Sequence, residues 1–447
     1  MPLSDSNSGF REALHISERK INLLCLWLLY GFTFTYFCFP DTGKLLMQLL
    51  ILAASVSILM QKSTLRTTPF LLFGLCILVQ TISWINSHLY HPELAETSLK
   101  LHRLAPWFLF IPVAWTLRTN NQSPWLLLTL ALTGFFLAAW TNGEGIDDFI
   151  KGFNGERPRF GVVNWEHASM LSAAALIGLI IFSRRVYQSQ KTSRSKALAI
   201  IATVTAMIYA AVLLKLSDTR AIFLGFSIAI ATTISFFLFQ NLKGGHKARS
   251  LTYGSICFAM LLSIIAFNYQ YIKSERWQKE SRTLSAITSF NFERMPYSSI
   301  GIRIHTWLEA AKFYKQHPIV GWGGNGKKLA IQTSTNLPEN IRNKFRHLHN
   351  TYLEVAVNYG ALGLAALASL YFWTFTHITS AWRRRMIHTD IYAFYMAYFS
   401  MWLIVNCFES YMFYSTGIYI YGLLTGITLH YTWPNHTHIH KQQINSK

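Results

Sequence analysis

Twelve long apolar blocks set the limits on what this chain of 447 residues can fold into. A helix of about 20 apolar residues crosses the hydrocarbon core of a bilayer. Because lipid offers no hydrogen bonds, the backbone there must pair within its own helix. The sequence therefore predicts an all-α polytopic membrane protein with about 12 transmembrane helices. The predicted spans are 21–39, 45–60, 70–88, 104–117, 124–140, 161–183, 197–216, 220–241, 251–271, 351–378, 391–412 and 415–432, the second and fourth being short.

Charge supports this class and suggests an orientation. Only 13% of the residues are charged, against about 25% in soluble proteins. The net charge is +20, and most basic residues lie between apolar blocks. With the N-terminus in the cytoplasm, the basic connections obey the positive-inside rule, so we expect both termini to be cytoplasmic and the first block to be a retained span. The cytoplasmic basic residues would be Lys62, Arg66, Arg118, the run 184–196, Lys243, Lys247, Arg249 and Arg383–Arg385.

One long hydrophilic segment, 272–350, does not follow the rule. It would be external, yet it has 13 Lys and Arg against 5 Glu. A solvated basic surface would explain this, but we favour a phosphate-bearing ligand, because Arg and Lys supply charge and donors to phosphate oxygens. The chain then divides into a bundle of about nine helices (1–271), an external loop domain (272–350), and about three further helices with a cytoplasmic tail (351–447).

The external loop contains local structure. Residues 303–316 repeat apolar side chains at helical spacing, which predicts an amphipathic helix on the membrane surface or against the bundle. It should end at His317-Pro318. The glycines of 321–326 would let backbone approach a ligand closely. They are a weak phosphate signal, because the P-loop Lys-Ser/Thr and a preceding strand are missing.

Two arginines are candidates for chemistry at the external face. Arg220 begins an apolar helix after the turn 217–219, where a charge is costly unless it reaches the interface or is paired. Arg303 begins the amphipathic helix of the loop. Snorkelling of Arg220 and simple solvation of Arg303 remain open alternatives.

Two histidines lie where the loop enters a membrane helix. If that helix has already begun, a spacing of two puts His347 and His349 about 200° apart. They would then not share a metal, and one would face a cavity while the other packs elsewhere. Two interfacial histidines with satisfied hydrogen bonds are the structural alternative.

Other polar residues are weaker candidates. Asp147-Asp148 are adjacent acids of a kind that is usually solvated, and we predict no metal site and no cofactor. Glu166 and His167 could line a groove or form a buried hydrogen-bonded pair. The tail histidines and the cysteines show no metal spacing that favours a site, and we expect a solvated tail and packing residues. These residues are His436, His438, His440, Cys25, Cys38, Cys76, Cys257 and Cys407.

Taken together, these residues resemble the O-antigen ligase and polymerase superfamily of bacterial surface-polysaccharide assembly. The resemblance covers 217–365 well and 159–365 in part, and its order and spacing are more specific for the superfamily than for ligase over polymerase. The matching positions are Ser217-Asp218-Thr219-Arg220; Arg303 with Trp307; His317, Pro318, Gly321 and Gly323; His349, Asn350, Leu353 and Gly360; and, more loosely spaced, the stretch 159–168.

The resemblance implies a periplasmic active site in the bacterial inner membrane. The donor would be a polysaccharide on undecaprenyl pyrophosphate, and the acceptor a sugar hydroxyl of lipid A-core. Arg220 and Arg303 would stabilise the leaving pyrophosphate, His349 would be the general base, and the reaction would be metal-independent and inverting. The implied substrate-binding residues are Arg159, His347, Arg346, Trp307 and Asn350.

Three alternatives remain at this point. A polymerase would use a lipid-linked repeat as acceptor with the same donor chemistry, and a protein glycosyltransferase would use Ser or Thr. A transporter or flippase of lipid-linked glycans also has about twelve spans, but such proteins usually show repeated halves and charges at the midplane, which we do not find in this sequence.

Overall fold

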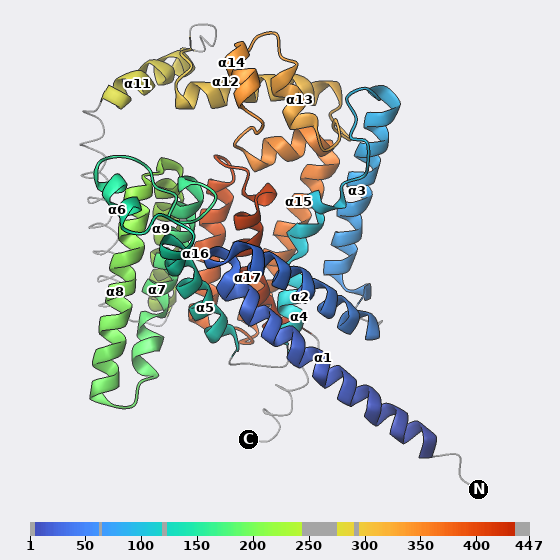
Figure 1. The fold of residues 1–447 in the computed structure, drawn as a ribbon, viewed down its shortest axis with the longest axis vertical. Helices are drawn as coiled ribbons and strands as arrows, with labels where there is room; N and C mark the ends of the chain where they lie inside the picture. Colours follow the sequence, from blue (N-terminus) through green and yellow to red (C-terminus); the bar gives the residue numbers. More distant parts are fainter. Residues whose placement is uncertain (1–4, 62–64, 119–122, 244–274, 290–294, 434–447) are drawn as a thin grey trace.

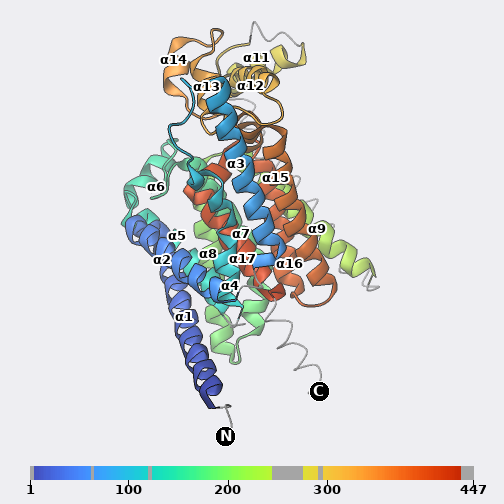
Figure 2. The same ribbon diagram turned by 90° about the vertical axis from the view of Figure 1, so that its right-hand side faces the viewer.

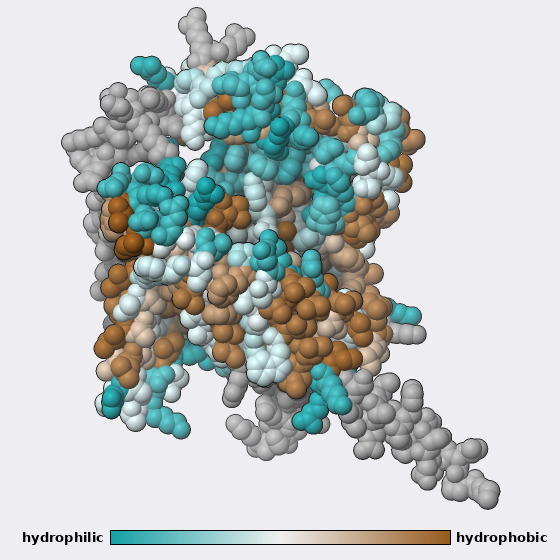
Figure 3. Space-filling model, in the orientation of Figure 1, coloured by the Kyte–Doolittle hydropathy of each residue, from teal (hydrophilic) through white to brown (hydrophobic). Residues whose placement is uncertain are grey.

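The chain forms a helical bundle with a cap of shorter helices at one end (Figure 1). The computed structural model describes residues 5–61, 65–118, 123–243, 275–289 and 295–433, and within these ranges it contains helices and no strand. The all-α prediction is therefore confirmed. Figure 3 shows hydrophobic residues gathered around the bundle and hydrophilic residues over the cap.

Eight helices of the described chain are long and apolar enough to cross a membrane. Their length follows from the apolar blocks, since a helix satisfies its backbone groups internally. They are α1 (Asp5–Cys38), α2 (Pro40–Met60), α3 (Thr68–Tyr90), α5 (Ser123–Thr141), α7 (Trp165–Gln188), α8 (Ser193–Ser217), α9 (Arg220–Lys243) and α15 (Thr351–Arg383).

The expectation of about twelve full-length spans is confirmed only for these eight. Block 104–117 is a 3₁₀ turn, Ala105–Phe108, followed by α4 (Phe110–Leu117). Blocks 391–412 and 415–432 give α16 (Thr389–Val405) and α17 (Ser415–Leu429). α16 ends at Val405, before the predicted residue 412, because the backbone and side chain of the next residue, Asn406, form hydrogen bonds with Thr351. The predicted span 251–271 and the tail histidines lie outside the described residues.

Helices from both ends of the chain pack into one bundle. α15 lies beside α3, α16 packs on α9, and α17 packs on α4 (Figures 1 and 2). Tyr419 of α17 stacks on Tyr36 of α1 with ring centroids 4.5 Å apart. α7 packs against α8, α9 and α16.

The cap consists of α11 (Glu275–Thr288), α12 (Ser299–Gln316), α13 (Gly326–Gln332) and α14 (Glu339–Lys344). We call this end of the bundle the loop face. α12 is the amphipathic helix expected at 303–316; it begins earlier because the side chain of Ser298 accepts a hydrogen bond from Gly301 N. Trp307 and Phe313 pack into a small core with Trp322, Leu348 and Val357, so α12 lies against α15, which fits the expected packing against the bundle.

The glycine-rich stretch docks onto α15. Gly360 has φ 64° and kinks that helix, and a Cβ there would lie 2.2 Å from Ile319 O. The backbone NH groups of Trp322 and Gly323 donate to Val357 O and Asn358 O, both at 2.9 Å. The glycines thus allow a close approach, as expected, but to another helix instead of a ligand.

The last described residues lie with α4 and part of α1 at the opposite face of the bundle. Arg118 after α4 pairs with Glu18 of α1 at 3.5 Å. Trp433 after α17 lies edge-on against Trp115, with centroids 6.3 Å apart. Figure 1 shows this face at the far end from α12 and α13.

Candidate active site

Four ionisable side chains from four separate segments meet where the cap joins the bundle. Arg303 of α12 donates to Glu166 of α7, with Nη2 2.8 Å from Oε1. His349, just before α15, lies with Nδ1 2.8 Å from Oε2 of Glu409, which follows α16. One carboxylate oxygen each of Glu166 and Glu409 and one ring nitrogen of His349 all lie within 4.8 Å of one another. These four residues are candidates for catalysis, and we call them the catalytic cluster.

His349 is held in an unusual backbone conformation. Its φ is 50°, in the left-handed region that few non-glycine residues adopt. The neighbouring residues fix it: Trp307 Nε1 donates to Leu348 O at 2.7 Å, and Asn350 caps α15 by accepting from Leu353 N at 3.1 Å. Strain of this kind persists only where surrounding contacts enforce it, and it is frequent at active sites.

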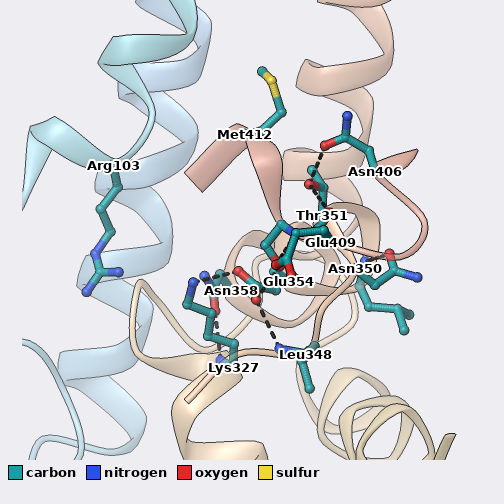
Figure 4. A network of polar contacts seen from close by, with 12 residues as sticks. Arg103, Lys327, Leu348, Asn350, Thr351, Glu354, Asn358, Asn406, Glu409 and Met412 are labelled. Carbon is teal, nitrogen blue, oxygen red and sulfur yellow. Dashed lines mark hydrogen bonds and ion pairs between the residues drawn. The ribbon is translucent and has the colours of Figure 1, made fainter. Parts of the chain in front are cut away.

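Glu354, which is fully buried, joins the two loops that present His349 and Glu409. It accepts from Leu348 N at 3.0 Å and from Ser410 Oγ at 2.7 Å. Its second oxygen lies 2.5 Å from Lys327 Nζ. Figure 4 shows Glu354 between Lys327 and Leu348, with Glu409 and Thr351 beyond it.

Thr351 ties the same loops together a second time. Its hydroxyl donates to Asn406 Oδ1 at 2.6 Å, and its backbone N donates to Asn406 O at 2.9 Å (Figure 4). Glu409 is fixed further by Ser410 N, which donates to Oε1 at 2.8 Å. One oxygen of Glu409 is therefore bound by backbone and the other by His349.

The paired charges set the protonation of the cluster. Burial disfavours the imidazolium of His349, but the hydrogen bond and charge of Glu409 outweigh it, so the pKa of His349 lies above its ordinary value. Burial alone would raise the pKa of Glu409. Hydrogen bonds from Glu166 and His349 outweigh burial and hold the pKa of Glu409 below its ordinary range. Because ionised Glu409 only accepts, His349 donates from Nδ1 and leaves Nε2 as the basic nitrogen.

His347 is placed differently from His349. Neither residue is helical, because α15 begins at Thr351, so the expected angle of about 200° between them does not apply. Their rings lie 6.1 Å apart, edge to face, and the His347 ring is 5.4 Å from Tyr414. Burial lowers the pKa of His347, which favours its neutral form.

The remaining candidates are spread around the catalytic cluster. Arg220 begins α9, and its neighbour Asp218 pairs with Arg157 at 3.3 Å. Within the described residues Arg220 belongs to neither ion pair of the cluster. Arg346 is exposed on the loop face, and Arg159 lines a separate hollow beside α6 (Ile146–Phe153).

Sequence reasoning overlooked Glu354 and Glu409 and left Glu166 undecided. A signal was present, because Glu354 and Glu409 are acids inside blocks 351–378 and 391–412. An ionisable residue in a membrane block is a functional candidate by default. Their partners were not evident, since His349 and Glu409 are 60 positions apart.

Glu166, His349 and Glu409 also have donor atoms suited to a divalent cation, and among the described residues they form one such set. The guanidinium of Arg303 already places a positive charge on Glu166. Asp148, in contrast, accepts from Glu144 N at 3.1 Å in the hollow beside α6.

Comparison with known families adds the decisive observation. Residues 205–368 match the family model described as O-antigen ligase. The chain carries an O-antigen ligase domain. This domain runs from the middle of α8 into α15, so it includes Arg220, Arg303 and His349. A search of curated proteins finds no match.

The O-antigen ligase domain and the apolar helices together make this a multi-pass membrane protein and an enzyme of the O-antigen ligase and polymerase type. Lipid-linked O-antigen substrates are those expected of that family. Glu166 and Glu409 lie outside the matched residues, one on each side. The catalytic cluster is thus completed by α7 and by the loop after α16, which flank the O-antigen ligase domain.

Proposed function

We propose that the protein is an O-antigen ligase of the bacterial inner membrane, with the loop face in the periplasm and both termini in the cytoplasm. It would transfer O-antigen polysaccharide from undecaprenyl pyrophosphate to a sugar hydroxyl of lipid A-core. The observation that carries this proposal is the His349–Glu409 pair, with Arg303 beside it on Glu166, within and next to the O-antigen ligase domain.

In this mechanism His349 is the general base. The acceptor hydroxyl attacks the anomeric carbon of the donor, and its proton passes to Nε2 of His349. Glu409 holds Nδ1–H at 2.8 Å, fixes the ring and stabilises the imidazolium that forms. General-base help of this kind is typically worth about 10²- to 10⁴-fold in rate.

Arginines stabilise the leaving group. As the bond between the anomeric carbon and the phosphate oxygen breaks, its electron pair goes to the pyrophosphate, where negative charge grows. Arg303 is held over the catalytic cluster by Glu166, and Arg220 stands at the start of α9, which packs on α7. Guanidinium groups suit phosphate oxygens because they offer several donors in a planar fork. One direct displacement predicts inversion at the anomeric carbon.

The function is tested with purified protein, a pyrophosphate-linked glycan and rough lipopolysaccharide, with and without EDTA. We expect glycan joined to the lipid A-core on a gel, unaffected by EDTA. His349→Ala, Arg220→Ala and Arg303→Ala should lose transfer by at least about 10²-fold. His388→Ala and Arg184→Ala are matched controls, since both residues are exposed and lie at the ends of α16 and α7 away from the loop face.

Each outcome separates the alternatives. Longer lipid-linked glycan with an untouched core would make the protein a polymerase. Loss of transfer with EDTA, restored by a divalent cation, would replace the metal-independent mechanism with one that uses Glu166, His349 and Glu409 as ligands. No transfer by folded protein to either acceptor would favour a transporter of lipid-linked glycans.

A further inference from the structure

A polar hollow reaches the first turn of α7, which also carries a residue of the catalytic cluster. It has a volume of about 570 Å³ and is formed by residues 142–144 after α5, by α6, and by residues 156–165. Trp165, the first residue of α7, lines it, and the next residue, Glu166, belongs to the catalytic cluster. The two sites are therefore neighbours along one helix.

The hollow is built by close backbone packing. Gly161 has φ 76°, and a Cβ there would lie 2.0 Å from Ala138 O. A Cβ on Gly143 would lie 2.7 Å from Asp148 Oδ2 and 2.9 Å from Gly161 N. The carboxylate of Asp148 is buried and accepts from Glu144 N. The walls of the hollow are therefore held in place by contacts within the protein.

The charges that face the hollow balance. Glu144, Asp148 and Glu156 line it together with Lys151, Arg157 and Arg159. A free phosphate would meet three carboxylates, and a cation would meet three basic groups, so neither is favoured. Sugar hydroxyls both donate and accept hydrogen bonds, and this mixture of partners suits them.

An aromatic face completes the wall. Trp165 is 38% exposed although its neighbours in α7, from His167 to Ala174, are buried. The face of an indole carries partial negative charge and attracts the C–H face of a sugar ring. Arg159 is exposed and makes no ion pair within the described residues, so its donors remain available.

The hollow also lies at a suitable depth. Ile146, Ile150 and Phe153 follow one another at helical spacing on α6 and are 60%, 51% and 73% exposed. Such a face places a short helix in the membrane interface. In Figure 3 the hydrophilic patch over α6 adjoins the hydrophobic side of the bundle. Arg157 further links the hollow to Asp218, in the turn before Arg220.

We propose that this hollow binds a pyranose ring of a membrane-linked glycan, with the ring stacked on Trp165 and its hydroxyls bonded to Asp148 and Arg159. The inference rests on the proposed function. The ring belongs either to the donor, next to its pyrophosphate, or to the acceptor core. Both are saccharides on a lipid anchor, and the experiment below separates them.

The test is the kinetics of Trp165→Ala in two arms. One arm varies the lipid-linked donor at saturating rough lipopolysaccharide, and the other varies the lipopolysaccharide at saturating donor. We expect KM in one arm to rise about tenfold with kcat within about twofold. A rise in the donor arm assigns the ring to the donor, and a rise in the acceptor arm assigns it to the core. Unchanged KM in both arms would overturn the proposal.

Matched variants guard against misfolding. Trp165→Phe keeps an aromatic face and should restore most of the affinity. Trp27→Ala removes a tryptophan of α1 that is more exposed than Trp165, at 66%, and should leave both KM values unchanged. A melting temperature of Trp165→Ala equal to that of wild type shows that the effect is local.

A binding measurement separates this inference from the proposed function. Saturation-transfer NMR is recorded for the His349→Ala protein with two soluble probes, the oligosaccharide of rough lipopolysaccharide and the O-antigen repeat released from its lipid. One probe should bind, and Trp165→Ala should abolish its signal. If wild-type protein fails to transfer glycan but this binding persists, the function fails and the saccharide site stands. If wild-type protein transfers glycan but the binding signal is unchanged by Trp165→Ala, the proposed saccharide site is wrong.

Discussion

At the scale of single residues, each cation of the site has its own carboxylate. His349 pairs with Glu409, Arg303 with Glu166, and Lys327 with Glu354. The first pair differs from the others in the proposed mechanism, because His349 would gain and lose a proton in each turnover. A carboxylate on Nδ1 fixes the tautomer, and it also raises the pKa of the ring.

Glu409→Gln should therefore change both rate and pH dependence. His349 acts as a base only when neutral, so kcat falls as the pH drops through its pKa. That pKa is raised by Glu409; without the charge it falls, and the acidic limb of the pH profile moves to lower pH. The plateau of kcat should fall about 10²- to 10⁴-fold. Transfer rates measured across pH give both quantities.

Glu93→Gln is the matched control for this change. Glu93 is an exposed acid 4.0 Å from His91, and neutralising it should leave the profile unchanged. An acidic limb that stays in place in Glu409→Gln would show that His349 is not the base whose titration limits kcat.

At the scale of elements, Glu354 of α15 connects the loop that carries His349 to the loop that carries Glu409. Glu354→Ala removes its bonds to Leu348 N and Ser410 Oγ and leaves Lys327 without its partner. Breaking a buried pair in this way costs about 3–5 kcal/mol. We expect a lower melting temperature and slower transfer, with the acidic limb of the remaining activity unmoved because His349 keeps Glu409. Glu339→Ala, an exposed acid of the cap, should change neither.

The kink of α15 gives a second prediction at this scale. Gly360→Ala would force a side chain into φ 64° and against Ile319 O, so the stretch 317–323 should undock from α15. The melting temperature should fall, and limited proteolysis should cut near 317–323. Gly74→Ala in α3 is the control, because no atom lies within 4 Å of the added Cβ. Equal melting temperatures for the two variants would contradict the assigned role of the kink.

The sequence predicted those features that depend on the residues of a single segment, and missed those that depend on contacts between distant segments. The long helices and α12 were foreseen, because length and periodicity belong to one segment. The end of α16 at Val405 was not, since it depends on Asn406 meeting Thr351, 55 positions away. Arg303 and His349 stood out as candidates, but their partners Glu166 and Glu409 became evident only when the helices were packed.

At the scale of the whole molecule, no single segment contains the site. The O-antigen ligase domain contributes Arg303 and His349, while α7 and the loop after α16 supply the acids that hold them. The cap lies at one end of the bundle, and the last described residues, after α17, lie at the other (Figure 1). The proposed transfer between two lipid-linked substrates would require the cap to face the compartment where both substrates are exposed.

Cysteine labelling tests that orientation. Arg346 is exposed on the loop face, and Arg384 is exposed after α15 at the opposite face. In intact spheroplasts a membrane-impermeant maleimide should label Arg346→Cys at once and Arg384→Cys only after permeabilisation. Cys25, Cys38 and Cys76 are buried, and the unsubstituted protein measures the remaining background. Glu339→Cys and Arg194→Cys repeat the comparison with independent positions. The reverse pattern would place the catalytic cluster in the cytoplasm, where the positive-inside rule does not put it.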